Sequence, residues 1–250
     1  MPRAALALTV AAAVLAAPST GTAAPPSPAA IAAARDYAAT RPGTVAFAVR
    51  TPTTFAGVRE DRAFPSASVL KAMLLVAYTR SARARPLRAE EKRLLNPMIR
   101  RSDNAAANVL FTRIGTAGLS RLAKTVGMRR FKAVSPIWGN SQITARDQTR
   151  FFLQIDTLLP PRHRAYGLKL LRTIVPSQRW GIGRVELPDW RVYFKGGWGS
   201  GTGAVDHQVA LLIRGEERVA IAVLTASNGS HAAGKETLEG IFERLLAETE

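Results

Sequence analysis

Apolar positions recur every three or four residues through the middle of the chain, whereas near both ends they alternate with polar ones or form short runs. The first pattern is typical of helices that bury one face, and the second is typical of strands. The pattern predicts helices over residues 28–39, 88–98, 105–114, 117–126, 144–158, 163–174 and 235–247, and one more that begins near Ser68. It predicts strands over residues 44–50, 54–59, 190–195, 207–214 and 218–225.

Local signals fix two of the predicted helix starts. Ser27 followed by Pro28 is typical of a capped first turn, because the Ser hydroxyl can accept from a free backbone N–H and proline suits the first helical position. Thr144 with Asp147 has the spacing of a capping box.

The order of elements predicts an α+β fold. Strands from both ends of the chain would form one mainly antiparallel sheet, flanked by the N- and C-terminal helices. The helices between about residues 64 and 175 would form an all-helical lobe inserted into that sheet. We expect one catalytic domain over residues 25–250, with a small-molecule site in the cleft between sheet and lobe.

The first 24 residues do not belong to this pattern. Arg3 is followed by an almost unbroken apolar run over residues 4–17, and the small residues 22–24 come next. This is the layout of a secretory signal, and the run is shorter than the roughly 20 residues of a spanning helix. We therefore predict a signal peptide over residues 1–24 and an extracytoplasmic location. A retained membrane anchor is the alternative.

Composition narrows the chemistry. There is no Cys, which excludes disulfides, thiolate metal sites and cysteine nucleophiles. The three His residues show no metal-ligand spacing, so we predict no metal, and we expect His163, His207 and His231 to lie in turns or on the surface. The net charge of +17 is spread along the chain, which fits an anionic cell-envelope polymer as a partner better than nucleic acid.

The most informative stretch is Ser68-Val69-Leu70-Lys71, which opens an apolar helix. Residues three apart share a helix face, so the Ser68 hydroxyl and the Lys71 amine would be neighbours. An amine that accepts the hydroxyl proton makes serine nucleophilic. By itself the S-x-x-K pattern is common and carries little weight.

Two later segments are ambiguous on their own. Ser102-Asp103-Asn104 lies between predicted helices, where it could relay a proton and hold an amide, or could simply cap the next helix. Lys195-Gly196-Gly197 ends a strand, where the Lys could bind a carboxylate and the glycines admit a ligand, or the segment could be an ordinary hairpin.

The three segments in this order resemble the S-x-x-K, S-D-N and K-T-G elements of penicillin-binding proteins and class A β-lactamases. The chain is similar to that superfamily of serine hydrolases over essentially everything after residue 24. Further matching segments are Phe64-Pro65, residues 102–110, Gly118-Leu119, residues 144–147 and residues 179–182.

The resemblance implies roles for particular residues. Ser68 would be the acylated nucleophile, Lys71 would take or relay its proton, and Ser102 would pass a proton to the leaving nitrogen. Asn104 would hold the substrate's side-chain amide, and Lys195 would supply positive charge to the relay and to a substrate carboxylate. Gly197 lies in the third element, and the backbone N–H groups of Ser68 and Trp198 would form the oxyanion hole.

The chain departs from the family pattern in three places. Gly196 replaces the residue whose hydroxyl meets the substrate carboxylate, and Ser200 or Thr202 could substitute for it. No Asp or Glu lies between Asp103 and Asp147, where class A enzymes carry the carboxylate that activates the deacylating water. The stretch between Ser68 and Ser102 is shorter than is usual, which implies a trimmed helical lobe.

The sequence thus predicts a secreted, monomeric, bacterial serine hydrolase of the class A β-lactamase type, without cofactor or metal. β-Lactams or related cell-wall peptides would acylate it at Ser68, and deacylation would be slow. A non-catalytic cell-wall-binding module on the same fold is one alternative. An esterase or D-Ala-D-Ala peptidase that uses the same serine is another.

Overall fold

The computed structural model describes residues 26–199 and 204–247. The helices are α1 (Pro28–Thr40), α2 (Leu70–Ser81), α3 (Ala89–Arg100), α4 (Asn104–Val126), α5 (Ala145–Leu153), α6 (Ile155–Leu158), α7 (Pro161–Arg172) and α8 (His231–Leu246). Short 3-10 turns are η1 (Ala67–Val69), η2 (Trp138–Asn140), η3 (Pro176–Gln178) and η4 (Gly181–Arg184). The strands are β1 (Thr44–Arg50), β2 (Phe55–Val58), β3 (Phe64–Pro65), β4 (Gln142–Ile143), β5 (Arg191–Gly199), β6 (Val205–Arg214) and β7 (Glu217–Ala226).

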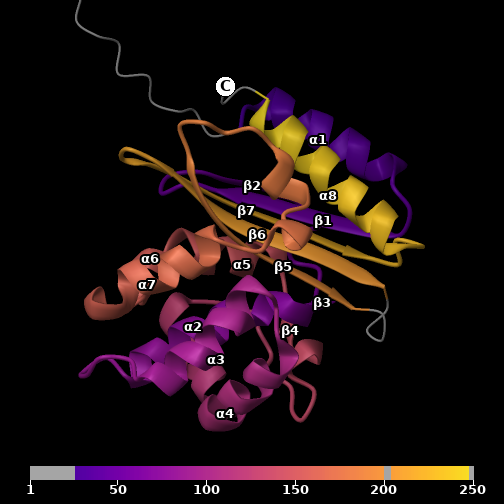
Figure 1. Cartoon of the computed structure of the whole chain (residues 1–250). Coiled ribbons are helices and arrows are strands. Elements are labelled where there is room, and N and C mark those ends of the chain that lie inside the picture. The colour runs from indigo at the N-terminus through magenta and orange to yellow at the C-terminus, as the bar shows by residue number, and fades with distance from the viewer. Residues whose placement is uncertain (1–25, 200–203, 248–250) are drawn as a thin grey trace, which may run out of the picture.

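Both ends of the chain contribute to one five-stranded antiparallel sheet, in the order β2-β1-β7-β6-β5. The helices α1 and α8 pack together on one face of this sheet, and α5 lies against the other face (Figure 1). Strands covered on both faces carry continuous apolar runs, and β6 and β7 are buried along nearly their whole length. The predicted α+β fold is confirmed.

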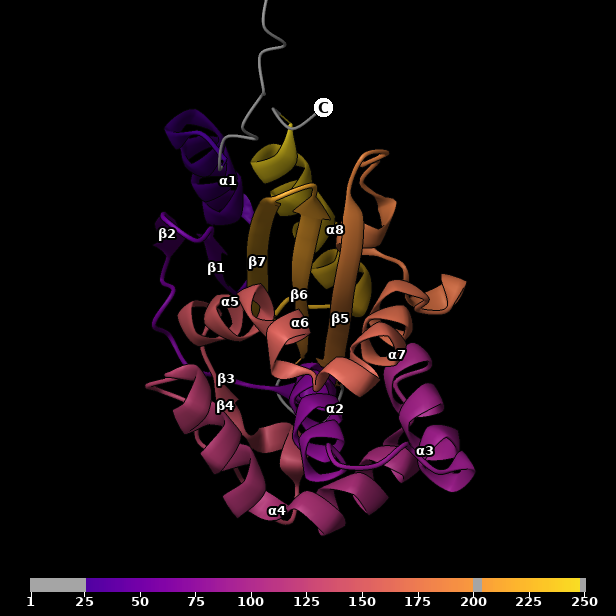
Figure 2. The same cartoon turned by 90° about the vertical axis from the view of Figure 1, so that its left-hand side faces the viewer.

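The helices α2, α3 and α4 gather at one end of the molecule, beyond α5 and α7 (Figure 2). They come from the segment predicted to form the inserted helical lobe. The short antiparallel strands β3 and β4 pair through Phe64 and Ile143 just before η1 begins, and β3 also lies against β7 of the main sheet. Among the described residues, no helix is both long enough and apolar enough to cross a membrane.

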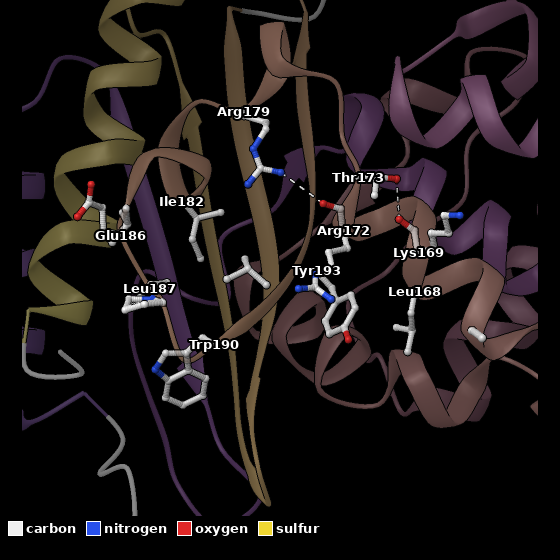
Figure 3. A pocket seen from close by; sticks show the side chains of 14 residues that line it. Leu168, Lys169, Arg172, Thr173, Arg179, Ile182, Glu186, Leu187, Trp190 and Tyr193 are labelled. Carbon is white, nitrogen blue, oxygen red and sulfur yellow. Dashed lines mark hydrogen bonds between the residues drawn. The ribbon is translucent and has the colours of Figure 1, made fainter.

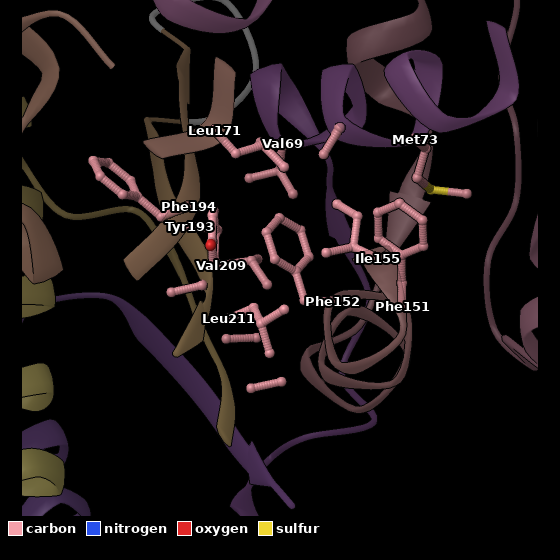
Figure 4. Packing of buried hydrophobic residues seen from close by; sticks show 14 of the residues in the cluster. Val69, Met73, Phe151, Phe152, Ile155, Leu171, Tyr193, Phe194, Val209 and Leu211 are labelled. Carbon is pink, nitrogen blue, oxygen red and sulfur yellow. The ribbon is translucent and has the colours of Figure 1, made fainter. Parts of the chain in front are cut away.

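The segment that carries Ser68 is anchored by the main core. Val69 is fully buried and lies close to Phe152 and Leu171 where the sheet, α5 and α7 meet (Figure 4). Since a buried side chain of this size stabilises a fold by about 1.5–3 kcal/mol, Val69 holds the backbone next to Ser68 firmly. The position of Ser68 is thereby tied to the sheet.

Several element boundaries differ from the sequence prediction, among them those of α5 and α8. The predicted helix over residues 144–158 is broken at Gln154, whose φ/ψ of −108° and 0° is not helical. The last helix begins at His231, earlier than predicted, because the Ser230 hydroxyl accepts a hydrogen bond of 3.0 Å from the Ala233 N–H.

Candidate active site

Ser68 lies in η1, at the entrance to α2. Ala67, immediately before it, has a φ of +43°, an unusual conformation for a residue with a side chain. The Ser66 N–H donates to the Ser141 carbonyl at 2.7 Å and fixes the turn. Ser68 is 9% exposed and lines a cavity of about 920 Å³. Its hydroxyl is therefore accessible to a small molecule.

Lys71 lies in the first turn of α2 and is fully buried. Its Nζ donates to the Ser102 carbonyl at 2.5 Å, to Ser102 Oγ at 3.2 Å and to Asn104 Oδ1 at 2.7 Å. The face of the Trp138 ring lies 5.1 Å away. Burial lowers the pKa of Lys71 to about 7, and the nearby charge of Asp103 opposes that change. This amine can therefore exist in both protonation states near neutral pH.

The segment Ser102-Asp103-Asn104 serves both predicted purposes. Asp103 caps α4, since its Oδ1 accepts from the Ala106 N–H at 2.7 Å. Ser102, with a φ of +58°, and Asn104 turn their polar atoms toward Lys71. A positive φ at a residue other than glycine costs of order 1–3 kcal/mol of folding free energy. The backbone at Ser102 therefore adopts an unfavourable conformation that places its side chain beside Lys71.

Lys195 reaches the same hydroxyl from the sheet. It lies in β5, is 1% exposed, and its Nζ donates to Ser102 Oγ at 3.0 Å and to the Gly196 carbonyl at 2.5 Å. Burial, and secondarily the charge of Lys71, lowers the pKa of Lys195 well below its usual value. A hydroxyl has two lone pairs and one hydrogen. Ser102 Oγ accepts from both lysines, so its own hydrogen is left to donate in another direction.

The two glycines after Lys195 are required by close packing. A Cβ on Gly196 would lie 2.9 Å from the Trp180 ring, so Trp180 fills the space where the related element carries a hydroxyl. A Cβ on Gly197 would lie 2.8 Å from the Ser68 nitrogen and 2.7 Å from the Val69 nitrogen. Gly197 thus allows β5 to approach the backbone of the Ser68 turn.

The structure brings the predicted site residues together in two layers. Ser68, Asn104 and Trp198 line the cavity, while Lys71 and Lys195 are buried behind them with Ser102 between. Within the described part of the chain, the Ser68 hydroxyl makes no hydrogen bond to either lysine. Ser200 and Thr202 lie outside the described residues.

A second cavity, of about 980 Å³, lies beside the first residues of β5, next to α7. It is lined by residues such as Arg172, Arg179, Trp190 and Tyr193, and it contains none of the predicted site residues (Figure 3). The chemistry predicted from the sequence therefore belongs to the cavity at Ser68, although that one is slightly smaller.

Two histidines are buried, contrary to the sequence prediction. His207 lies inside β6, where its Nδ1 accepts from the Thr225 N–H at 3.1 Å and its Nε2 donates to the Pro65 carbonyl at 2.9 Å. Burial lowers its pKa to about 4. His163 is 3% exposed, and its Nε2 lies 3.1 Å from the Ala82 carbonyl. The sequence next to each histidine does not reveal this burial, because the strands and helices that cover the two side chains are far away along the chain.

Asp147 has a structural role, because its carboxylate holds a backbone turn. Its carboxylate accepts from the backbone N–H groups of Arg129 and Arg130, at 3.0 and 2.7 Å, and it does not line the Ser68 cavity. Over the described ranges, no cluster of His, Asp or Glu could hold a metal ion.

Two further residues, which were not predicted from the sequence, line the Ser68 cavity. Asp206, in β6, and His231, at the start of α8, are hydrogen-bonded. They are 25 positions apart and carry no local motif, so only the meeting of β6 with α8 could have revealed them.

Ser68 is accessible, and beside it two buried lysines donate to the hydroxyl of a second serine, Ser102. On this fold, such an arrangement defines a serine hydrolase. The family model for the beta-lactamase enzyme family matches residues 91–247, which include Ser102, Asn104 and Lys195 but begin after Ser68 and Lys71. This match covers more than half of the chain. The protein therefore belongs to the beta-lactamase enzyme family and is a serine hydrolase of the β-lactamase type.

Solved structures show the same fold. A beta-lactamase from Sphaerobacter thermophilus has 23% identity and a TM-score of 0.74, over 88% of this chain and 97% of its own. A beta lactamase from Xanthomonas campestris has 17% identity and a TM-score of 0.77, over 88% and 97%. An ancestral class A beta-lactamase has 17% identity and a TM-score of 0.74, over 88% and 100%. No curated protein matches the chain.

Proposed function

We propose that this protein is a secreted hydrolase that β-lactams or related cell-wall peptides acylate at Ser68. The observation that carries the proposal is the convergence of Lys71 and Lys195 on Ser102 Oγ, beside an accessible Ser68. Two amines with lowered pKa values and a hydroxyl between them can accept, hold and return one proton.

The acylation step uses these groups in sequence. Ser68 Oγ attacks the carbonyl carbon of the amide while Lys71, in its neutral form, takes the hydroxyl proton. The backbone N–H groups of Ser68 and Trp198 stabilise the oxyanion; one such donor is worth about 3–4 kcal/mol of barrier in other enzymes. The carbon–nitrogen bond then breaks, the nitrogen takes the Ser102 hydroxyl proton, and Lys71 returns a proton to Ser102.

The resemblance implies two tasks for Lys195, in the proton relay and in binding a substrate carboxylate. Its buried position favours the first. Its Nζ faces Ser102 and the Gly196 carbonyl, and it is not among the residues that line the cavity. We infer that Lys195 supports the proton relay, and that it is not the direct partner of a substrate carboxylate.

We further propose that hydrolysis of the acyl-enzyme is slower than its formation. A carboxylate positioned to activate water beside Ser68 is the usual requirement for fast turnover in class A enzymes. Asp147 instead holds the backbone at Arg129 and Arg130. We therefore expect an adduct long-lived enough to isolate.

One observation favours an esterase that uses the same serine. Gly196 offers no hydroxyl to a substrate carboxylate, and Trp180 leaves no room for one. Substrates without a carboxylate, such as simple esters, would lose nothing from this change. Comparing acylation by a penicillin and by its neutral ester would separate the two activities.

Labelling with a fluorescent penicillin tests the proposal. The wild-type protein should carry a covalent label after denaturation, and Ser68→Ala should carry none. Ser66→Ala is a matched control, since Ser66 lies two residues away and is fully buried. Equal labelling of the wild type and Ser68→Ala would contradict the assignment of Ser68.

A further inference from the structure

A buried carboxylate and an imidazole form a second polar unit in the Ser68 cavity. The ring Nδ1 of His231 lies 2.5 Å from Asp206 Oδ1, and Asn228 Nδ2 donates to Asp206 Oδ2 at 2.9 Å. Asp206 is 2% exposed, whereas the side chain of His231 retains 42% of its exposure. The carboxylate is thus held inside the protein and the imidazole is presented to solvent.

The His231 ring is held on its face and edge by two tryptophans. It stacks on Trp198 with centroids 5.7 Å apart and an interplanar angle of 28°, and Trp180 meets it edge to face at 5.8 Å. Trp198 belongs to β5, whose Gly197 packs against the Ser68 turn. The ring is therefore fixed relative to the strand that borders the nucleophile.

The hydrogen bond to Asp206 determines which nitrogen of His231 is available. With the proton on Nδ1 donated to the carboxylate, Nε2 of the neutral ring carries the free lone pair. Among the described residues, Nε2 has no hydrogen-bond partner. A carboxylate that orients an imidazole in this way makes it an effective general base.

The other described residues lining this cavity offer no comparable base. They supply neutral amides, aromatic rings, aliphatic groups and the Ser68 hydroxyl, and Asp206 and His231 are the ionisable pair among them. Lys71 is the nearest competitor, but its Nζ donates to three oxygens at once and is buried. It must break one of these bonds before it can accept a proton.

We propose that His231, positioned by Asp206, is the general base that activates the water that hydrolyses the Ser68 acyl-enzyme. The inference rests on the proposed acylation of Ser68. The chain has no acidic residue between Asp103 and Asp147, where class A enzymes carry the carboxylate that activates water. The proposal assigns this task to the carboxylate–imidazole pair from β6 and α8.

The step balances as an ester hydrolysis. The water oxygen forms a bond to the acyl carbon while one water proton passes to His231 Nε2. The bond between the acyl carbon and Ser68 Oγ then breaks, and Oγ takes that proton from the His231 imidazolium. The product leaves as a carboxylic acid, and His231 and Lys71 are both neutral for the next cycle.

The lifetime of the adduct measures this step separately from acylation. The full-length protein is mixed with excess benzylpenicillin, the free drug is removed, and intact mass is followed with time. His231→Asn keeps a donor for Asp206 but cannot take up a proton. We expect it to form the adduct at the wild-type rate and to lose it about 100-fold more slowly, which is the usual minimum contribution of a general base.

Chemical rescue distinguishes a base from a structural residue. In His231→Ala, added imidazole should restore adduct loss in proportion to its concentration and leave adduct formation unchanged. Glu243→Ala, at an exposed position further along α8, is the control and should behave as the wild type. Unfolding temperatures of all variants verify that the fold is intact.

Each outcome decides the question. Unchanged adduct lifetime in His231→Asn, or a folded His231→Ala that imidazole does not rescue, would overturn the role of His231. A wild-type adduct that never decays would overturn it as well. A wild-type protein that forms no adduct with benzylpenicillin or with a neutral penicillin ester would instead contradict the proposed function itself.

Discussion

Lys71 combines two properties that are normally opposed. It is fully buried, which favours the neutral amine, and it donates to three oxygens, which favours the ammonium. Burial is the larger influence and lowers its pKa to about 7. The residue can therefore accept a proton near neutral pH.

The pH dependence of acylation should follow this residue. Since only neutral Lys71 can take the Ser68 proton, the acylation rate should rise about tenfold between pH 6 and 8 if its pKa is near 7. Stopped-flow measurement of adduct formation checks this. Lys71→Arg stays protonated and should acylate at least about 100-fold more slowly. A flat profile in the wild type would contradict Lys71 as the base.

His207 should make stability depend on pH. Its pKa of about 4 in the folded state lies below the ordinary 6.5, so the unfolded chain binds more protons between these values. The full contribution is present above pH 6.5 and is lost as the pH falls toward 4, by about 3 kcal/mol in total.

Denaturant titrations at pH 7 and pH 4.5 measure this loss. His207→Gln retains a donor for the Pro65 carbonyl and does not titrate. We expect its free energy of unfolding to fall less than that of the wild type over the same interval. An equal fall in both proteins would mean that other groups cause the acid sensitivity.

At the residue scale, short patterns were informative where neighbours in sequence act together. Ser68 and Lys71 share a helix turn, and Asp103 caps the helix whose first residue is Asn104. His207 and Asp206 were not predictable, because their partners Pro65 and His231 come from other parts of the fold.

At the scale of elements, the edge of β5 is shaped by what packs against it. Trp180 precedes η4 and lies against Gly196, while η1 lies against Gly197. The strand can therefore carry no side chain at either position without moving a neighbour. The departure from the family's K-T-G pattern follows from the presence of this tryptophan.

Gly196→Thr should be destabilising for this reason. Its Cβ would lie 2.9 Å from the Trp180 ring, and such overpacking costs about 1–3 kcal/mol. In the double variant with Trp180→Leu, the cost should be smaller than the sum of the two single changes. Equilibrium unfolding of the four proteins measures the coupling. Additive effects would show that the ring does not limit this position.

The sequence predicted the long elements better than the short ones. Strands β6 and β7 and helix α1 were evident from apolar runs and the Ser27 cap. The two-residue strands β3 and β4 were not, because a pair so short has no periodicity of its own. Yet this pair fixes the backbone just ahead of Ser68.

At the scale of the whole molecule, both ends of the chain meet in one sheet, and the residues proposed to act in catalysis come from both sides of the fold. Ser68 and Lys71 belong to the helical region, whereas Lys195 belongs to the sheet. The order of helices and strands was enough to predict this closure. It could not predict the cavity walls, which depend on side chains from six separate segments.

Export is predicted for the whole chain from residues 1–24, which lie outside the described ranges. If they form a cleaved signal, the protein recovered outside a bacterial host should begin at Pro25. Intact mass and N-terminal sequencing check this. A membrane-bound product that retains Arg3 would support the anchor instead.

The location of the covalent adduct tests the assignment of the nucleophile most directly. After brief incubation with benzylpenicillin, the protein is digested and the modified peptide is sequenced by mass spectrometry. We predict one penicilloyl group, on Ser68. An adduct on Ser66 or Ser102, or equal modification of Ser68→Ala, would contradict the central role given to the Ser68 hydroxyl.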